Sequence, residues 1–153
     1  AVATSSEGMI AVLPEPVLSV AMNKNANLRV ALDLTDEWSQ NKGSASLVQG
    51  CIVVRTAFLE EHPAEVAKFL EEYKASIEFL NSNVADAANM VVDLGIYAGA
   101  AAVAEKAIPK CNIVYMDGEE MQTALSAFLE VMYGVAPASV GGKLPEADFY
   151  YKK

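Results

Sequence analysis

Four short apolar runs constrain the fold of this chain more than any other feature of its sequence. They cover residues 9–13, 28–34, 47–55 and 112–116 and are rich in valine, isoleucine and leucine. Apolar runs of this length, bounded by turn or helix signals, are typical of buried β-strands. Because helical patterns separate and follow these runs, the order of elements predicts an α/β domain, with a mixed sheet and flanking helices.

The helical pattern is strongest after His62 and Pro63, where the proline occupies a typical first helical position. Apolar residues then recur at three- and four-residue spacing, at Val66, Phe69, Leu70, Tyr73, Ile77 and Leu80. Further helices are predicted over residues 17–22, 83–94 and 99–108, and from a capping residue at Asp117 through Met132. Residues 35–46 are polar, and we expect them to form a long loop.

Composition excludes several classes of protein. The chain has 153 residues, of which 53% are hydrophobic and 20% charged, as expected for one globular domain. Its formal net charge of -9 would repel a phosphate backbone, so we expect no nucleic-acid partner. No uninterrupted apolar stretch reaches the roughly 18 residues that a membrane-spanning helix needs.

The sequence carries no recognisable catalytic or metal-binding motif. It lacks a Gly-x-Ser-x-Gly turn, a phosphate-binding glycine loop and a His-Glu-x-x-His pair. Cys51 and Cys111 have no cysteine or histidine at metal-binding spacing, and both lie among β-branched residues, which predicts small side chains packed in strands. The sequence leaves open whether the two cysteines form a disulfide with each other. We therefore expect a protein that is not an enzyme and uses no cofactor or metal.

Glu15 is the most promising candidate for a ligand-binding residue. It lies between Pro14 and Pro16, directly after the apolar run of residues 9–13. Open α/β sheets place ligand-contacting groups at the ends of strands, and two prolines would fix the backbone there. The alternative is a turn glutamate that is solvated by water.

Residues of the polar segment and its C-terminal flank supply further candidates. Trp38 is the single tryptophan and could offer a stacking surface, while Ser44, Ser46 and Gln49 could donate or accept neutral hydrogen bonds. Trp38 is equally suited to fill a core beneath a long loop.

Three stretches resemble the periplasmic binding proteins of ATP-driven importers, namely residues 9–34, 50–80 and 141–151. The first contains IAVLPEPVLSV, the second GCIVVRTAFLEEHPAEVAKFL, and the third reads GGKLPEADFYY. The likeness is to the type II branch, which includes nitrate, sulfonate, taurine and thiamine-precursor binding proteins (the NMT1/THI5-like group). It covers nearly the whole chain.

The resemblance implies part of a two-lobed α/β fold that closes on a small molecule and delivers it to an ABC permease. Residues 1–34 would form the end of the second lobe and a crossover, and residues 35–153 the return portion of the first lobe. On this template the N-terminal half is absent, which implies a homodimer or strand exchange. Pro14, Glu15 and Pro16 would face the cleft, and Ser46 and Gln49 would approach the hinge.

The resemblance also implies a location in the periplasm, or on the extracellular face of the cytoplasmic membrane as a lipoprotein. Two alternatives to the solute-binding subunit stay open. One is an enzyme on the same fold that uses its bound small molecule as a substrate. The other is an autonomous α/β interaction module that shares only ancestry with the binding proteins.

Overall fold

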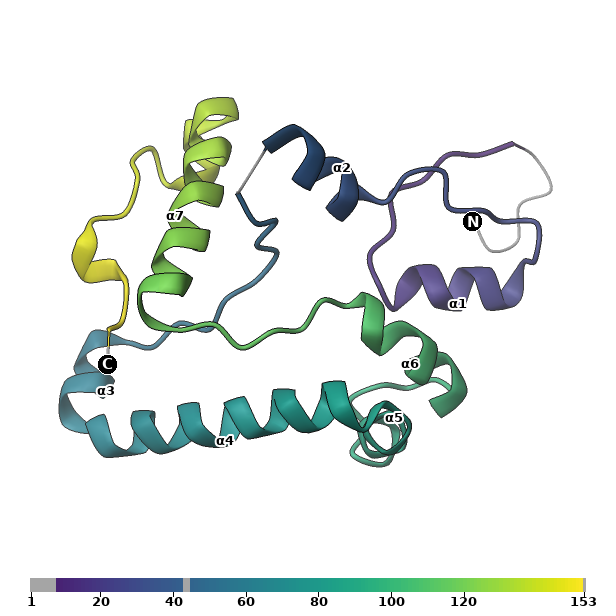
Figure 1. Cartoon of the computed structure of the whole chain (residues 1–153), viewed down its shortest axis with the longest axis horizontal. Helices are drawn as coiled ribbons and strands as arrows, with labels where there is room; N and C mark the ends of the chain where they lie inside the picture. The colour runs from purple at the N-terminus through teal and green to yellow at the C-terminus, as the bar shows by residue number, and fades with distance from the viewer. Residues whose placement is uncertain (1–7, 43–44, 153) are drawn as a thin grey trace. The chain divides into compact units, whose positions relative to one another are not determined.

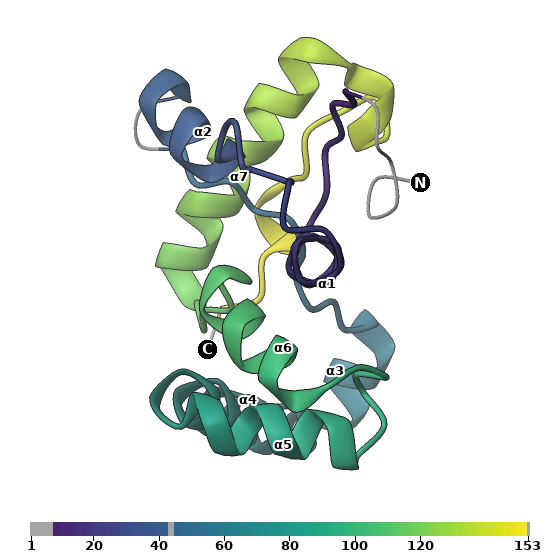
Figure 2. The same ribbon diagram turned by 90° about the vertical axis from the view of Figure 1, so that its right-hand side faces the viewer.

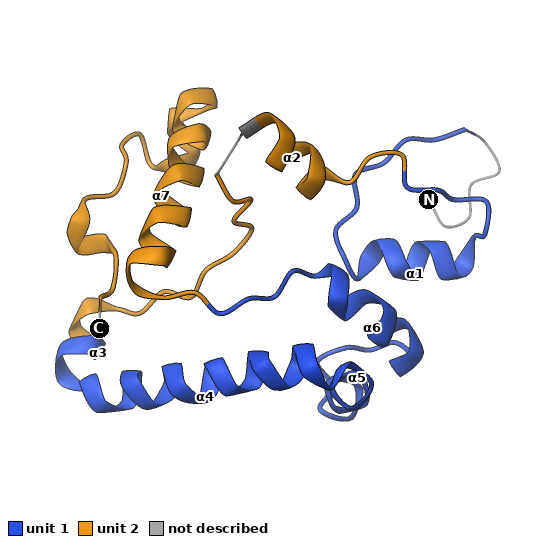
Figure 3. Cartoon of the chain, viewed as in Figure 1, with its two compact units in different colours: residues 1–30, 58–115 blue, residues 31–57, 116–153 orange. Residues whose placement is uncertain are grey.

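The computed structural model describes residues 8–42 and 45–152, and their regular elements are all helical (Figure 1). The α-helices are α1 (Val17–Lys24), α2 (Leu34–Lys42), α3 (Thr56–Glu61), α4 (Pro63–Ser82), α5 (Val84–Asp93), α6 (Ala101–Ala107) and α7 (Gly118–Val135). Short 3₁₀ turns follow at η2 (Ile108–Lys110), η3 (Pro137–Val140) and η4 (Ala147–Phe149). The chain divides into unit 1, residues 1–30 and 58–115, and unit 2, residues 31–57 and 116–153 (Figure 3).

The predicted α/β fold, with its mixed sheet in a two-lobed type II architecture, is wrong. Helices make up 61% of the described residues, and none of those residues lies in a strand. The predicted strands at residues 9–13, 28–34, 47–55 and 112–116 are mostly irregular chain; Leu34 instead begins α2. A strand becomes stable only when its backbone groups pair with a neighbouring strand.

That pairing is missing here. Within the described residues, the backbone groups of residues 9–13, 29–32 and 46–54 form no hydrogen bonds with other backbone groups. Apolar side chains in these segments are correspondingly exposed, with 97% of the Ile10 surface and 75% of the Val53 surface accessible. These segments are apolar, as the sequence indicates, but apolar character does not by itself supply a partner strand.

Unit 1 is organised around a small core between α5 and α6. The core consists of Ala87, Ala88, Ala104 and Ile108, with Leu80, Val84, Val91 and Tyr97 packed against it. Figure 2 shows α4, α5 and α6 close together at the bottom of the view. Three of the four core residues are alanines, so the helices approach closely and leave little room for a larger side chain.

Unit 2 is organised around α7. Leu125 on this helix is buried, and further apolar residues at helical spacing are at least partly buried, namely Met121, Ala124, Phe128, Leu129 and Met132. Trp38 of α2 contacts Phe128, with 5.5 Å between ring centroids. Tyr150, just after η4, is also buried.

The helices predicted from sequence form, and α2 and α3 are additional to them. His62, Asn83 and Asp117 occupy N-cap positions as expected, although none of their side chains makes a capping hydrogen bond. The predicted loop at residues 35–46 is wrong, because α2 occupies most of it. Asp33 supports the start of α2, where its Oδ1 accepts a hydrogen bond from the backbone N–H of Thr35 at 2.9 Å.

No helix in the described part of the chain combines the length and apolar character that crossing a membrane requires.

Candidate functional site

Glu15 lies at the turn that leads from the irregular segment of residues 8–13 into α1. The carbonyl oxygens of Pro14 and Pro16 accept hydrogen bonds from the N–H groups of Leu18 and Val20, each at 3.0 Å. The two prolines thereby fix the backbone on both sides of Glu15, as the sequence predicted. The Glu15–Pro16 peptide bond is cis.

The two oxygens of the Glu15 carboxylate have different surroundings. Oε2 accepts a hydrogen bond from the backbone N–H of Ser19 in the first turn of α1, at 3.1 Å. Oε1 is buried and has no hydrogen-bond partner; it is the only such side-chain atom among the residues that the structure describes. A turn glutamate solvated by water would not show this pattern. A buried carboxylate oxygen without a partner costs on the order of 1–3 kcal/mol.

Cys111 is electrostatically coupled to this carboxylate. Burial raises the pKa of the Cys111 thiol, and the negative charge of Glu15 raises it further. Both residues belong to unit 1, in which α1 packs against α6. No sequence motif connects them, because the helix packing alone brings Cys111 close enough to feel the charge of Glu15. Sequence analysis therefore missed Cys111 as a neighbour of the candidate site.

Cys51 departs from its prediction. It was expected to pack within a strand, but it is exposed and lies in irregular chain. Cys111 was also expected in a strand; it is half-buried and lies in a bend after η2. Both cysteines are free thiols.

The remaining predicted ligand-binding residues belong to unit 2, whereas Glu15 belongs to unit 1. Trp38 donates a hydrogen bond from Nε1 to the carbonyl oxygen of Ala45, at 2.7 Å. Together with its contact to Phe128, this bond matches the alternative interpretation of Trp38 as a core residue. Ser46 and Gln49 are exposed, and Ser44 lies outside the described residues.

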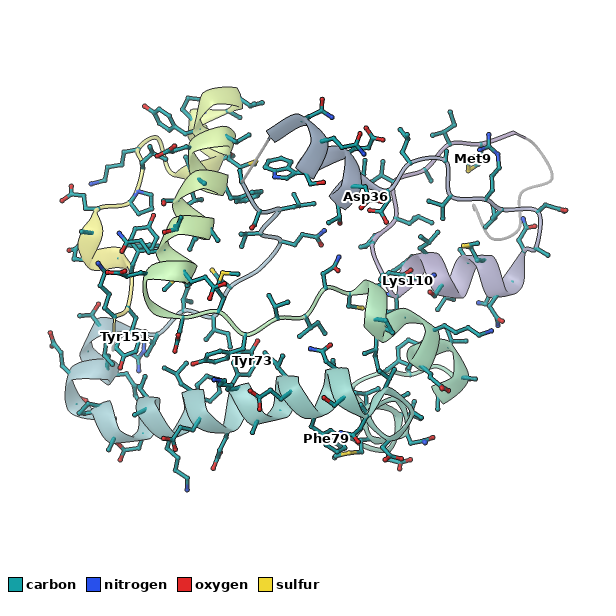
Figure 4. The ribbon with its side chains drawn as sticks, in the orientation of Figure 1. Met9, Asp36, Tyr73, Phe79, Lys110 and Tyr151 are labelled. Atoms are coloured by element: carbon teal, nitrogen blue, oxygen red, sulfur yellow. The ribbon has the colours of Figure 1, made fainter. Side chains whose placement is uncertain are left out.

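A cluster of aromatic rings on α4 is the other notable group in unit 1. Phe69 and Tyr73 stack with ring centroids 5.6 Å apart, and Tyr73 contacts Tyr115 at 6.1 Å. Tyr73 is labelled on α4 in Figure 4. Lys74 Nζ lies 5.8 Å from the centroid of the Tyr115 ring. Asn81 Nδ2 donates to the carbonyl oxygen of Ile113 at 3.0 Å, so this cluster holds the chain after α6 along α4.

No three histidine, cysteine or acidic side chains among the described residues gather closely enough to hold a metal ion. His62 contacts Phe58 and lies 3.9 Å from Glu65, and both members of that pair are largely exposed. The Glu15 carboxylate is therefore the best-defined candidate site: a fixed anionic acceptor with one buried oxygen that has no hydrogen-bond partner.

No family model, curated protein or solved structure matches this chain.

Proposed function

We propose that this chain is a solute-binding subunit of an ABC importer, or part of one, and that Glu15 contacts the solute. The observation that carries the proposal is the buried, unpartnered Oε1 of Glu15. The surrounding prolines and the hydrogen bond from Ser19 hold the carboxylate in one position. A fixed acceptor with one unused oxygen suits the reversible capture of a hydrogen-bond donor.

The chemistry of the site favours a solute that carries an amino or ammonium group. A carboxylate only accepts hydrogen bonds, and charge-assisted bonds to it are roughly twice as strong as neutral ones. An N–H donor on the solute would restore the partner that Oε1 lacks. A simple anion without a donor, such as nitrate, would instead be repelled by the charge of Glu15.

The rest of the proposal follows the family resemblance. The subunit would hold its ligand without transforming it, deliver it to a permease, and act in the periplasm or as a lipoprotein outside the cytoplasmic membrane. Binding would shift the protein toward whichever conformation holds the ligand better. Catalysis, a cofactor and a nucleic-acid partner form no part of the proposal.

The matched ligands taurine and ethanesulfonate test the proposal, because they differ only by the amino group. Isothermal titration calorimetry should detect taurine binding to the native chain, and ethanesulfonate should bind about tenfold more weakly or not at all. Glu15→Gln removes the charge but keeps the size of the side chain, so it should abolish most of this preference.

Glu78→Gln is the matched control, since Glu78 is an exposed glutamate of α4 in the same unit. It should bind taurine as the native chain does. Equal affinity of the native chain and Glu15→Gln for taurine would refute the role of Glu15. Absence of taurine binding to the native chain would count against the proposed solute class.

The exposed apolar segments favour a second candidate function, that of an interaction module. Ile10, Val12 and Val53 each leave at least three quarters of their surface exposed, at 97%, 77% and 75%. Exposed apolar surface of this extent commonly marks a protein–protein contact. The taurine titration separates the two candidates, because a solute-binding subunit should bind taurine, whereas a module that acts only through protein contacts should not.

A further inference from the structure

Residues 46–54 form the longest segment in the described chain whose backbone groups make no backbone hydrogen bonds. The segment has no turn or bend along its length and contains neither proline nor a charged residue. Its second half, Cys51–Ile52–Val53–Val54, combines three β-branched residues with a cysteine. Unpaired backbone beside such side chains is a template for the addition of a strand.

The side chains of this segment are accessible to a partner. Cys51 is exposed, and Ile52, Val53 and Val54 leave 52%, 75% and 38% of their surfaces exposed. Burial of apolar surface drives association in water, so covering these side chains favours a complex. We propose that residues 48–54 of this segment pair in antiparallel fashion with the same residues of a second copy of this chain, with the two-fold axis at Cys51.

The distribution of charge favours a second copy of this chain as the partner of the segment. The chain carries a net charge of -9, so two copies repel each other across most of their surfaces. Residues 43–54 contain no charge, and the residues on either side, Lys42 and Arg55, are both basic. The ends of this segment therefore attract an acidic copy, whereas most other surfaces would repel it.

The two-fold arrangement also separates the basic ends of the two copies. Pairing Cys51 with Cys51 places Arg55 opposite Leu47 of the second copy. The two arginines then lie eight residues apart along the ladder, or about 27 Å at 3.4 Å per residue. This distance is well beyond the screening length of about 8 Å at physiological salt. Repulsion between the two arginines is therefore small.

Other irregular segments are shorter, carry charged residues or have backbone groups that are already hydrogen-bonded. Residues 9–13 are shorter, residues 28–33 include the charged Arg29 and Asp33, and the carbonyl oxygen of Ile113 already accepts a bond from Asn81. One pair of seven-residue strands buries less than the roughly 800 Å² per partner of a standard interface. The dimer should accordingly be weak and should depend on protein concentration.

Sedimentation velocity over micromolar to submillimolar concentrations tests the association without any ligand. The native chain should shift from monomer to dimer, and Val53→Lys should weaken the dimer by about tenfold or more, because it places a charge on the pairing segment. Val53→Thr keeps a β-branched side chain and should weaken it less. Far-ultraviolet circular dichroism checks that each variant keeps its helix content.

Cysteine crosslinking tests the register. Under mild oxidation the Cys111→Ser variant, which retains Cys51, should form a disulfide-linked dimer, and the Cys51→Ser variant should not. A monomer at every concentration, a Val53→Lys variant that dimerises as strongly as Val53→Thr, open-ended polymers, or failure of Cys51 to crosslink would each overturn the proposal. The dimer experiments contain no ligand, so failure of the dimer proposal would not affect the test of taurine binding.

Discussion

The alanine core between α5 and α6 offers a direct test of how unit 1 is held together. Ala88 exposes only 1% of its surface and packs with Ala87, Ala104 and Ile108. Ala88→Leu adds three carbon atoms where the two helices meet. Overpacking of this kind typically costs about 1–3 kcal/mol, because neighbouring side chains and the backbone must move. For a chain of this size, that cost corresponds to a lowering of Tm by roughly 2–12 °C.

Ala85→Leu is the matched control, because Ala85 is an exposed alanine of the same helix. Alanine and leucine differ little in helix propensity, so its effect should stay within about 0.5 kcal/mol. Urea unfolding followed by circular dichroism at the helix band gives both free energies of unfolding. If Ala88→Leu were as stable as Ala85→Leu, α5 and α6 would not pack around Ala88 as described.

Two further predictions rest on the raised pKa values of Cys111 and Tyr150. Glu15→Gln removes one cause of the raised Cys111 pKa, so the thiolate fraction of Cys111 at mildly alkaline pH should increase. The rate of iodoacetamide alkylation should therefore increase at Cys111 and not at Cys51. An unchanged rate at Cys111 would contradict its coupling to Glu15. Burial, and then the charge of Glu130, raise the pKa of Tyr150 above the usual value of about 10. In that range the folded state binds more protons than the unfolded state, so stability is lost as pH rises through the unfolded and then the folded pKa. Tyr150→Phe should therefore flatten the decline of the unfolding free energy above about pH 10, whereas a decline as steep as that of the native chain would refute the assignment.

Local sequence signals predicted most of the helices because a helix closes its hydrogen bonds within its own segment. Pro63 marks the start of α4, and Gly95, with a φ of 70°, follows the end of α5. The sequence also contains a signal for α2: Asp33 in a capping position, followed by Asp36 and Glu37 in the first turn. The polar composition of residues 35–46 instead favours a loop, which is why the sequence does not predict α2.

For the candidate site, the sequence identified Glu15 and the prolines that fix it, because backbone restriction is a local property. It could not show that one carboxylate oxygen is buried without a partner, since that depends on what packs around the turn. It also could not associate Cys111 with Glu15, or decide between the two roles considered for Trp38. Each of these depends on which helices pack together.

Local sequence signals identified α1, α4, α5, α6 and α7, the apolar residues, and the proline-restricted turn at Glu15. Only the tertiary structure decided that the apolar runs do not pair as strands within the described chain, and that an alanine core joins α5 and α6. The physical reason is the range of the interactions: helical hydrogen bonds connect residues four apart, whereas strand pairing and burial require partners from distant parts of the chain. The exposed segment of residues 46–54 is a direct consequence, because its composition suits a strand and its fold supplies no neighbour.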